Sequence, residues 1–145
     1  MSEHLSIDRT FQAPRARVWH AWTDPEAIAE WWGPDGFHVP RHSIDLDLRD
    51  GGHFNLTMVE AGNSTELPVR FRVDQIVEHQ LLVFFSAAQP ELGSSTDTTT
   101  RVSFGDVGQG TLVKLGSGPY TSEMARSAEL GWERQFDKLA QLLAR

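Results

Sequence analysis

The chain has 145 residues, a formal net charge of -7 and no cysteine, which fits one domain with a substantial core, over residues 1–145. The lack of cysteine excludes disulfides, thiol catalysis and cysteine-ligated metals, and the acidic balance disfavours a nucleic-acid partner, which would need a basic footprint. No apolar run reaches the length of a membrane span, and the first residues lack the pattern of a secretory signal, so we expect a cytoplasmic protein.

The first residues predict a strand followed by a helix. Leu5, Ile7 and Phe11 fall on one face and polar residues on the other, which is typical of a half-buried strand. Pro14 suits the first position of a helix, because its missing N–H needs no partner there. The apolar face of that helix would consist of Val18, Trp19, Ala21 and Trp22.

A second short helix should begin after Asp24, which can act as its N-cap, and end at Gly33-Pro34. Its apolar stripe contains the adjacent pair Trp31 and Trp32. Neighbouring helical residues point about 100° apart, so both rings cannot enter one core equally. Either one ring stands at a pocket mouth or a partner surface, or both pack, one of them under the loop that follows.

The middle of the chain predicts a meander of strands. Alternating apolar residues begin at Ile44, turn at Asp50-Gly51-Gly52 and turn again at Ala61-Gly62-Asn63. The apolar run of residues 81–85 is short and aromatic, which favours a strand buried on both faces over a piece of buried helix. Residues 93–100 should form a loop that enters the next strand.

The pattern becomes helical over residues 121–144. Apolar residues recur there every three or four positions, namely Met124, Ala128, Trp132, Phe136, Leu139 and Leu143. Such a helix would be about 36 Å long, enough to cross a sheet. A strand-rich middle with one long helix predicts an α+β architecture in which the helix packs against one sheet face.

Several segments together resemble the AHSA-type branch of the SRPBCC superfamily, named for activators of a heat-shock chaperone ATPase and their homologues. The resemblance is carried by Arg9-Thr10-Phe11, Ala13-Pro14-Arg15, Val18-Trp19, residues 21–26 (AWTDPE), residues 31–34 (WWGP), Asp47-Leu48-Arg49, Gly51-Gly52, Leu82-Val83-Phe84, Gly131-Trp132 and residues 139–143 (LAQLL). It covers nearly the whole chain.

This resemblance implies the START-like helix-grip fold, in which a curved antiparallel sheet wraps the C-terminal helix and two short helices close one end. A cavity often lies between sheet and helix in the superfamily, and some members of the branch stimulate the chaperone ATPase. Two departures bear on the cavity. Phe71 stands where the family commonly has a small glycine, so an inward Phe71 would fill space, and Ser86-Ala87-Ala88 would open space nearby.

We therefore expect a cavity that binds a small apolar or amphipathic ligand, with no cofactor. The candidate residues on the helix and loop side are Trp32, Phe37, Met124, Ala128, Gly131, Trp132 and Gln135. The candidate residues on the sheet side are Phe54, Leu56, Met58, Phe71, Val73, Phe84, Val102 and Phe104. Each of them can also be plain core. Gly131, which lies in the middle of the C-terminal helix, has two possible roles. It lets a ligand or a strand approach the helix backbone, or it packs closely against Trp19, Trp22 or the sheet.

Neither a metal site nor a nucleophile is predicted. His38 and His42 lie in an extended segment that sets them too far apart to share one ion, and no nucleophile motif is present. If the pocket holds an acid or base, the better candidates are His53 or Arg72 at its rim.

Three functions stay open. Ligand binding comes first. A partner role, for instance with a heat-shock chaperone, predicts an exposed Trp32 or a contiguous apolar patch. An enzyme of the cyclase or dehydratase kind predicts a buried polar side chain with a perturbed pKa. The sequence predicts no particular oligomeric state.

Overall fold

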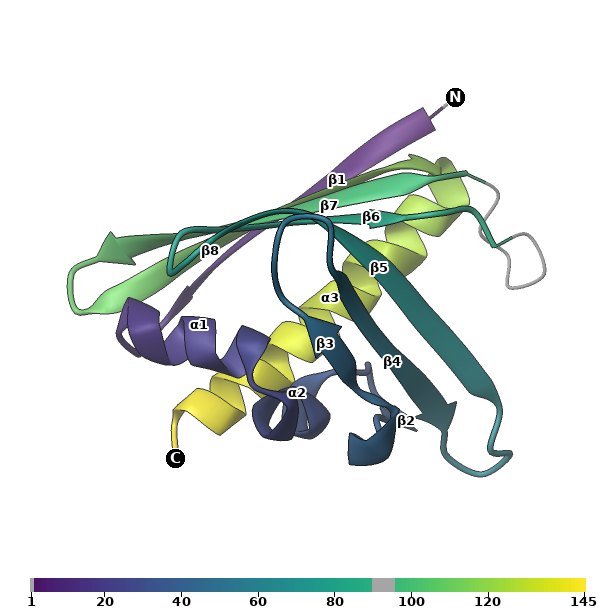
Figure 1. Ribbon diagram of the computed structural model, residues 1–145, viewed down its shortest axis with the longest axis horizontal. Helices are drawn as coiled ribbons and strands as arrows, with labels where there is room; N and C mark the ends of the chain where they lie inside the picture. The colour runs from purple at the N-terminus through teal and green to yellow at the C-terminus, as the bar shows by residue number, and fades with distance from the viewer. Residues whose placement is uncertain (1, 90–95) are drawn as a thin grey trace.

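A single antiparallel sheet curves around one long helix (Figure 1). The computed structural model describes residues 2–89 and 96–145. The elements in chain order are β1 (Ser2–Phe11), α1 (Arg15–Thr23), α2 (Pro25–Trp31), β2 (Phe37–His38), the 3-10 turn η1 (Arg41–Ser43), β3 (Asp45–Asp47), β4 (His53–Glu60), β5 (Glu66–Val77), β6 (Leu81–Ser86), β7 (Thr98–Val107), β8 (Gly110–Thr121) and α3 (Ser122–Leu143). The strands lie side by side in the order β1-β8-β7-β6-β5-β4-β2, and β3 also pairs with β4.

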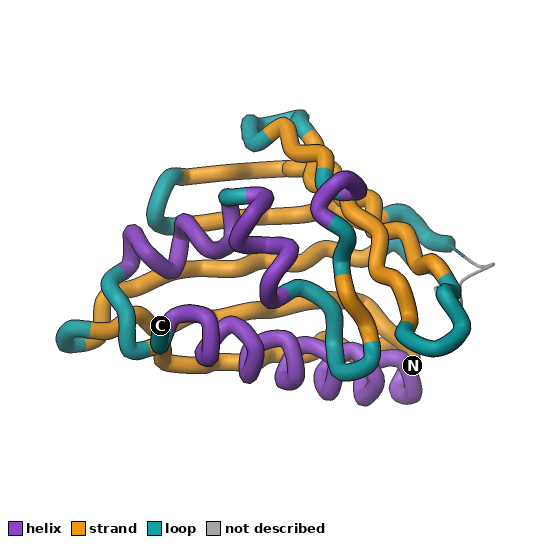
Figure 2. Tube along the Cα trace, turned by 90° about the horizontal axis from the view of Figure 1, so that it is seen from below, coloured by secondary structure: helices purple, strands orange, loops and turns teal. Residues whose placement is uncertain are grey.

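The described α-helices, α1, α2 and α3, lie on the same side of the sheet (Figure 2). α3 packs against β1 and β8, and α1 and α2 pack against each other and against α3 near its C-terminal end. One layer of sheet and one layer of helices bury a common core between them. The predicted α+β helix-grip architecture is therefore confirmed.

The helix boundaries follow local capping chemistry. The Asp24 carboxylate accepts a hydrogen bond from the Ala27 N–H at 3.0 Å, as predicted for α2. The Thr121 hydroxyl accepts one from the Met124 N–H at 3.2 Å and starts α3. Pro14 was expected inside the first turn of α1, but it has extended backbone angles and precedes the helix as its N-cap.

Strand β6 is buried on one face only, so the prediction of two buried faces is wrong. Leu82 and Phe84 are buried, while the alternate residues Leu81, Val83 and Phe85 are partly exposed. The reason is that the sheet is antiparallel and carries helices on one side, which leaves its other face to solvent. On that outer face the Arg72 guanidinium carbon lies 4.4 Å from the Phe85 ring centre. The strand that follows begins at Thr98, and residues 93–95 of the expected loop lie outside the described residues.

Both tryptophans of the pair pack in the core, as the second of the two alternatives predicted. Trp31 and Trp32 are 0% and 3% exposed. Both enter the core because α2 ends at Trp31, and Trp32 continues with extended backbone angles (φ -71°, ψ 144°). The 100° rule for neighbouring helical residues does not apply across that boundary. The Trp31 indole N–H donates to the Ala21 carbonyl at 2.8 Å, which satisfies it inside the core.

Trp22 stands at the centre of the core. Its ring centre lies within about 6 Å of the rings of five neighbours, which are Trp31, Trp32, Phe104, Trp132 and Phe136. Aromatic pairs of this kind contribute about 0.5–1.5 kcal/mol each beyond the burial of area. The cluster therefore ties α1, α2, α3 and the sheet together. None of the described helices is both long and apolar enough to cross a membrane.

Candidate functional site

An apolar groove of about 200 Å³ opens between the N-terminal half of α3 and the inner faces of β4 and β5. It exists because α3 packs on β1 and β8, at one end of the strand order, while β4 and β5 lie towards the other end. A register shift in β5 between Val73 and Gln75 adds a local bend. The lining residues are Trp32, Pro34, Met58, Val69, Phe71, Ala128, Gly131, Trp132 and Gln135.

The walls of the groove are largely aromatic. Trp32 meets Trp132 edge to face, with ring centres 5.3 Å apart. Phe71 points towards the groove and stacks on Phe84, with ring centres 5.1 Å apart. Phe71 therefore takes up part of the space, as its size suggested, yet leaves an opening beside α3.

Gln135 is the single polar side chain in this lining, and it is 5% exposed. Its Oε1 accepts the Gly33 N–H at 2.9 Å. One turn further along α3, Lys138 Nζ donates to the Gly33 carbonyl at 2.8 Å. Gly33 has φ +99°, a conformation that favours glycine. Because Gln135 and Lys138 bind its N–H and its carbonyl, α3 holds both sides of this residue and fixes the loop that borders the groove.

The Lys138 ammonium is partly removed from water by this contact. Burial lowers the pKa of Lys138, and the nearby Asp35 carboxylate opposes that shift. Because a lowered pKa disfavours the charged form, this ammonium contributes less to stability than an exposed lysine would. The side chain lies beside the groove rather than in its lining.

Gly131 forms an open section of the groove wall. A Cβ placed there would meet no atom within 4 Å outside the helix's own nearby backbone. The alternative that this glycine packs closely against Trp19, Trp22 or the sheet is therefore wrong. Glycine costs about 1 kcal/mol relative to alanine inside a helix, and here Gly131 lines both the groove and the neighbouring hollow beside Leu130.

The fifteen residues proposed from sequence divide into three groups. Trp32, Met58, Phe71, Ala128, Gly131, Trp132 and Gln135 line the groove. Phe54, Leu56, Val73, Phe84, Val102 and Phe104 are buried in the core. Phe37 in β2 and Met124 in the first turn of α3 are partly exposed and lie outside the lining.

Sequence reasoning missed two lining residues, Pro34 and Val69. Val69 shares the inner face of β5 with Phe71, so the strand alternation alone could have identified it. The sequence around Pro34 carries only the signal of a helix stop. No local pattern connects it with the groove, because it reaches the site through the loop that Gln135 and Lys138 hold.

The proposed rim acids or bases lie on the wrong face of the sheet. His53 and Arg72 are direct cross-strand partners in β4 and β5. Both alternate with the inward residues Phe54 and Phe71, so they face away from α3. Instead, His53 Nε2 lies 3.1 Å from Asp45 Oδ1, and Arg72 Nε lies 2.6 Å from Asp74 Oδ1. Within the described residues, no group of three or more potential ligands could hold a metal ion.

Besides Lys138, a second half-buried polar group, Tyr120, has a perturbed pKa, and it lies away from the groove. The Tyr120 hydroxyl lies 2.8 Å from Ser117 Oγ, which lies 2.8 Å from Thr100 Oγ1. Burial raises the pKa of Tyr120, and the hydrogen bond to Ser117 partly opposes it. None of these three residues lines the groove. The groove lining itself offers apolar surface and one amide, which suits binding rather than proton transfer.

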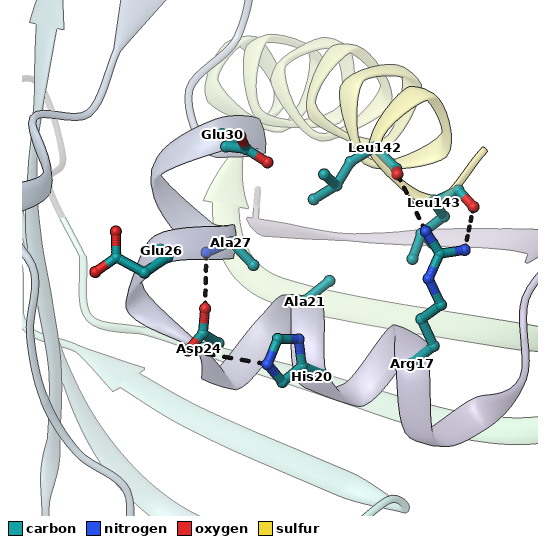
Figure 3. Close-up of a pocket in the computed structure, with 9 residues that line it drawn as sticks. All are labelled: Arg17, His20, Ala21, Asp24, Glu26, Ala27, Glu30, Leu142 and Leu143. Atoms are coloured by element: carbon teal, nitrogen blue, oxygen red, sulfur yellow. Dashed lines mark hydrogen bonds and ion pairs between the residues drawn. The ribbon is translucent and has the colours of Figure 1, made fainter. Parts of the chain in front are cut away.

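A second hollow, of about 370 Å³, lies between α1, α2 and the C-terminal end of α3 (Figure 3). Its polar groups are already used to join these helices. Arg17 donates to the carbonyls of Leu142, Leu143 and Arg145 at the end of α3, and Asp24 caps α2. Arginine at a helix C-terminus satisfies carbonyls that have no partner in the helix. This hollow is therefore explained by the fold, and the apolar groove is the better candidate site.

Comparisons with known proteins agree with this architecture. The family model described as "Activator of Hsp90 ATPase homolog 1-like protein" matches residues 12–144. A search of curated proteins finds no match.

Three solved structures illustrate the likeness of fold. Protein CV1439 from Chromobacterium violaceum is 21% identical, with 98% of this chain and 97% of that chain covered and a TM-score of 0.87. The AHSA1 protein SPO3351 from Silicibacter pomeroyi is 22% identical, with 98% of each chain covered and a TM-score of 0.80. An AHSA1-like protein from Aeromonas hydrophila is 22% identical, with 96% and 90% covered and a TM-score of 0.79. Because the family model spans most of the sequence, the chain belongs to the AHSA1-like family of the SRPBCC superfamily.

Proposed function

We propose that the protein binds a small apolar or amphipathic ligand in the groove between α3 and β4–β5. The observation that carries this proposal is the chemistry of the lining, in which every residue except Gln135 is apolar or glycine. Concave, mostly apolar sites with few polar groups are typical of small-molecule binding. Fully packed cores leave few voids larger than a water molecule, so a groove of about 200 Å³ is open space that a ligand can use.

A neutral fluorescent probe tests this proposal directly. N-phenyl-1-naphthylamine is suitable because the net charge of -7 would repel anionic probes. We expect saturable binding that Ala128→Leu weakens at least tenfold, since Ala128 lines the groove. The matched control is Ala125→Leu, which adds the same side chain to α3 outside the lining. Absence of binding, or equal weakening by both variants, would overturn the proposal.

A second candidate is a partner role with a heat-shock chaperone, which the family description suggests. Trp32, whose exposure this role predicted, is buried at 3%. Leu130 offers a different apolar contact, because it is 57% exposed and borders a hollow formed with Pro34, Ser127 and Arg134. Leu130 is a single exposed apolar side chain rather than the contiguous apolar patch that this role predicted.

The chaperone candidate is tested by an ATPase assay with a bacterial chaperone of the ninety-kilodalton class. We expect saturating protein to stimulate the chaperone ATPase and Leu130→Gln to abolish that stimulation. Leu142→Gln is not a suitable control, because Leu142 packs against the core. Glu129→Gln, an exposed change one residue away, serves as the matched control. Unchanged ATPase turnover with the wild-type protein would eliminate this candidate.

A further inference from the structure

We infer that Gln135 makes the groove selective for flat molecules of one or two aromatic rings that carry a neutral hydrogen-bond acceptor. This inference rests on the proposed ligand-binding function and adds a ligand class to it. Its basis is the single amide group placed in an otherwise apolar lining.

The hydrogen bond to Gly33 fixes which end of the amide faces a ligand. The Gly33 N–H can only donate, so the oxygen of Gln135 must be the atom 2.9 Å from it. The amide nitrogen is left with two N–H donors. They make no hydrogen bond within residues 2–89 and 96–145, and the nitrogen is not one of the fully buried polar atoms that lack a partner, so it is accessible from the groove that Gln135 lines. A ligand acceptor would replace water as the hydrogen-bond partner of this donor, whereas an apolar ligand would displace the water without replacing its hydrogen bond.

The size and walls of the groove restrict the rest of the ligand. An apolar cavity of about 150 Å³ holds one benzene molecule, so about 200 Å³ suits one or two fused rings. The side chains of Trp32, Phe71 and Trp132 offer ring edges and faces, which favour another flat aromatic system.

Charge sets the kind of acceptor. The lining contains no cationic side chain, and the net charge is -7, so a carboxylate or phosphate would gain no ion pair there. A neutral acceptor, such as a ring nitrogen or a carbonyl, meets the amide without that desolvation cost.

Three probes of one size separate these contributions. Naphthalene has no polar group, quinoline has one acceptor and indole has one donor. For the wild-type protein at pH 8, followed by ¹⁵N chemical shifts, we expect quinoline to bind about three to ten times more tightly than naphthalene. Indole should bind no more tightly than naphthalene, because its N–H would face the amide donors.

The decisive variant is Gln135→Glu, which keeps an oxygen for the Gly33 N–H and removes the donors. We expect it to abolish the preference for quinoline and to favour indole over quinoline. Gln141→Glu, the same change at an exposed position of α3, should leave the wild-type order unchanged. If Gln135→Glu does not fold, the wild-type order of the three probes still decides.

The outcomes distinguish this inference from the proposed function. Equal affinities for the three probes, or a quinoline preference that survives in Gln135→Glu, would overturn the inference and leave apolar binding intact. Binding of none of the probes, together with no binding of N-phenyl-1-naphthylamine, would overturn both.

Discussion

The two halves of α3 carry the same apolar stripe and meet different surroundings. In the C-terminal half, Phe136, Leu139 and Leu143 are buried. In the N-terminal half, Met124 and Ala128 are only partly buried, and Trp132 marks the transition. The stripe therefore does not set burial by itself. The sheet does, because β1, β8 and the short helices cover one half while β4 and β5 stand away from the other.

This contrast assigns different tasks to the two halves. The C-terminal half contributes stability, through Phe136 and its ring contacts with Phe11, Trp22 and Trp132. The N-terminal half leaves room beside Ala128 and Gly131. Changes at the buried stripe residues Phe136, Leu139 and Leu143 should therefore act on folding, and changes at Ala128 and Gly131 should act on binding.

The largest effect should come from Phe136→Ala. Phe136 is fully buried, so we expect a loss of about 3–5 kcal/mol in the free energy of unfolding, measured by urea denaturation. Met124→Ala, on the same stripe but partly exposed, should cost about 1 kcal/mol or less. Similar costs for the two variants would remove the contrast between the halves.

A smaller effect of opposite sign is expected from Gly131→Ala. The added methyl group enters open space and raises helix propensity, so the free energy of unfolding should rise by about 0.5–1 kcal/mol. The same methyl group narrows the groove, so probe affinity should fall. A thermal melt and a probe titration on the same sample check both halves of the prediction. A destabilised variant would show that the space beside Gly131 is needed by the fold.

The smallest effect should be an alkaline loss of stability linked to Tyr120, next to the start of α3. Because the folded-state pKa is raised above 10.0, this contribution is complete below the unfolded pKa and is lost as pH rises through the folded pKa. Tyr120 is the single tyrosine of the chain, so phenolate absorbance reports on it alone.

Two variants control the Tyr120 measurement. Tyr120→Phe should lose the phenolate signal and the linked decline in stability. Lys138→Met should remove the opposite dependence, since the lowered pKa of Lys138 makes stability increase with pH below 10.5. A Tyr120 titration midpoint at or below 10 would contradict the prediction.

Sequence periodicity predicted most of the fold because each element carries its own signal. The α3 stripe, the Asp24 cap and the glycine turns are local patterns that tertiary packing did not override. The family resemblance supplied the wrap of sheet around helix. Two local rules failed for reasons of tertiary structure. The helical spacing of side chains does not apply to Trp32, because it lies just past the end of α2. The apolar run of β6 does not mean two buried faces, because one face of that strand has no covering layer.

The groove was harder to predict than the fold. Inward-facing residues could be named from alternation, but alternation does not say which of them remain next to open space. Phe54 and Phe71 are direct cross-strand partners on the inner face, yet Phe54 is buried and Phe71 borders the groove. That difference depends on the path of α3 across the sheet. The role of Gln135 likewise depends on Gly33, which lies 102 positions away in the chain.

The double attachment of Gly33 to α3 has a consequence for how occupancy could be measured. Gln135 holds its N–H and Lys138 its carbonyl, so this peptide unit moves with the helix rather than with the loop. A molecule seated against Gln135 would have to leave before that hydrogen bond opened. The Gly33 amide proton should then exchange with solvent deuterium more slowly as the bound fraction rises. The exchange rate at this one backbone position would therefore report how much of the groove is occupied.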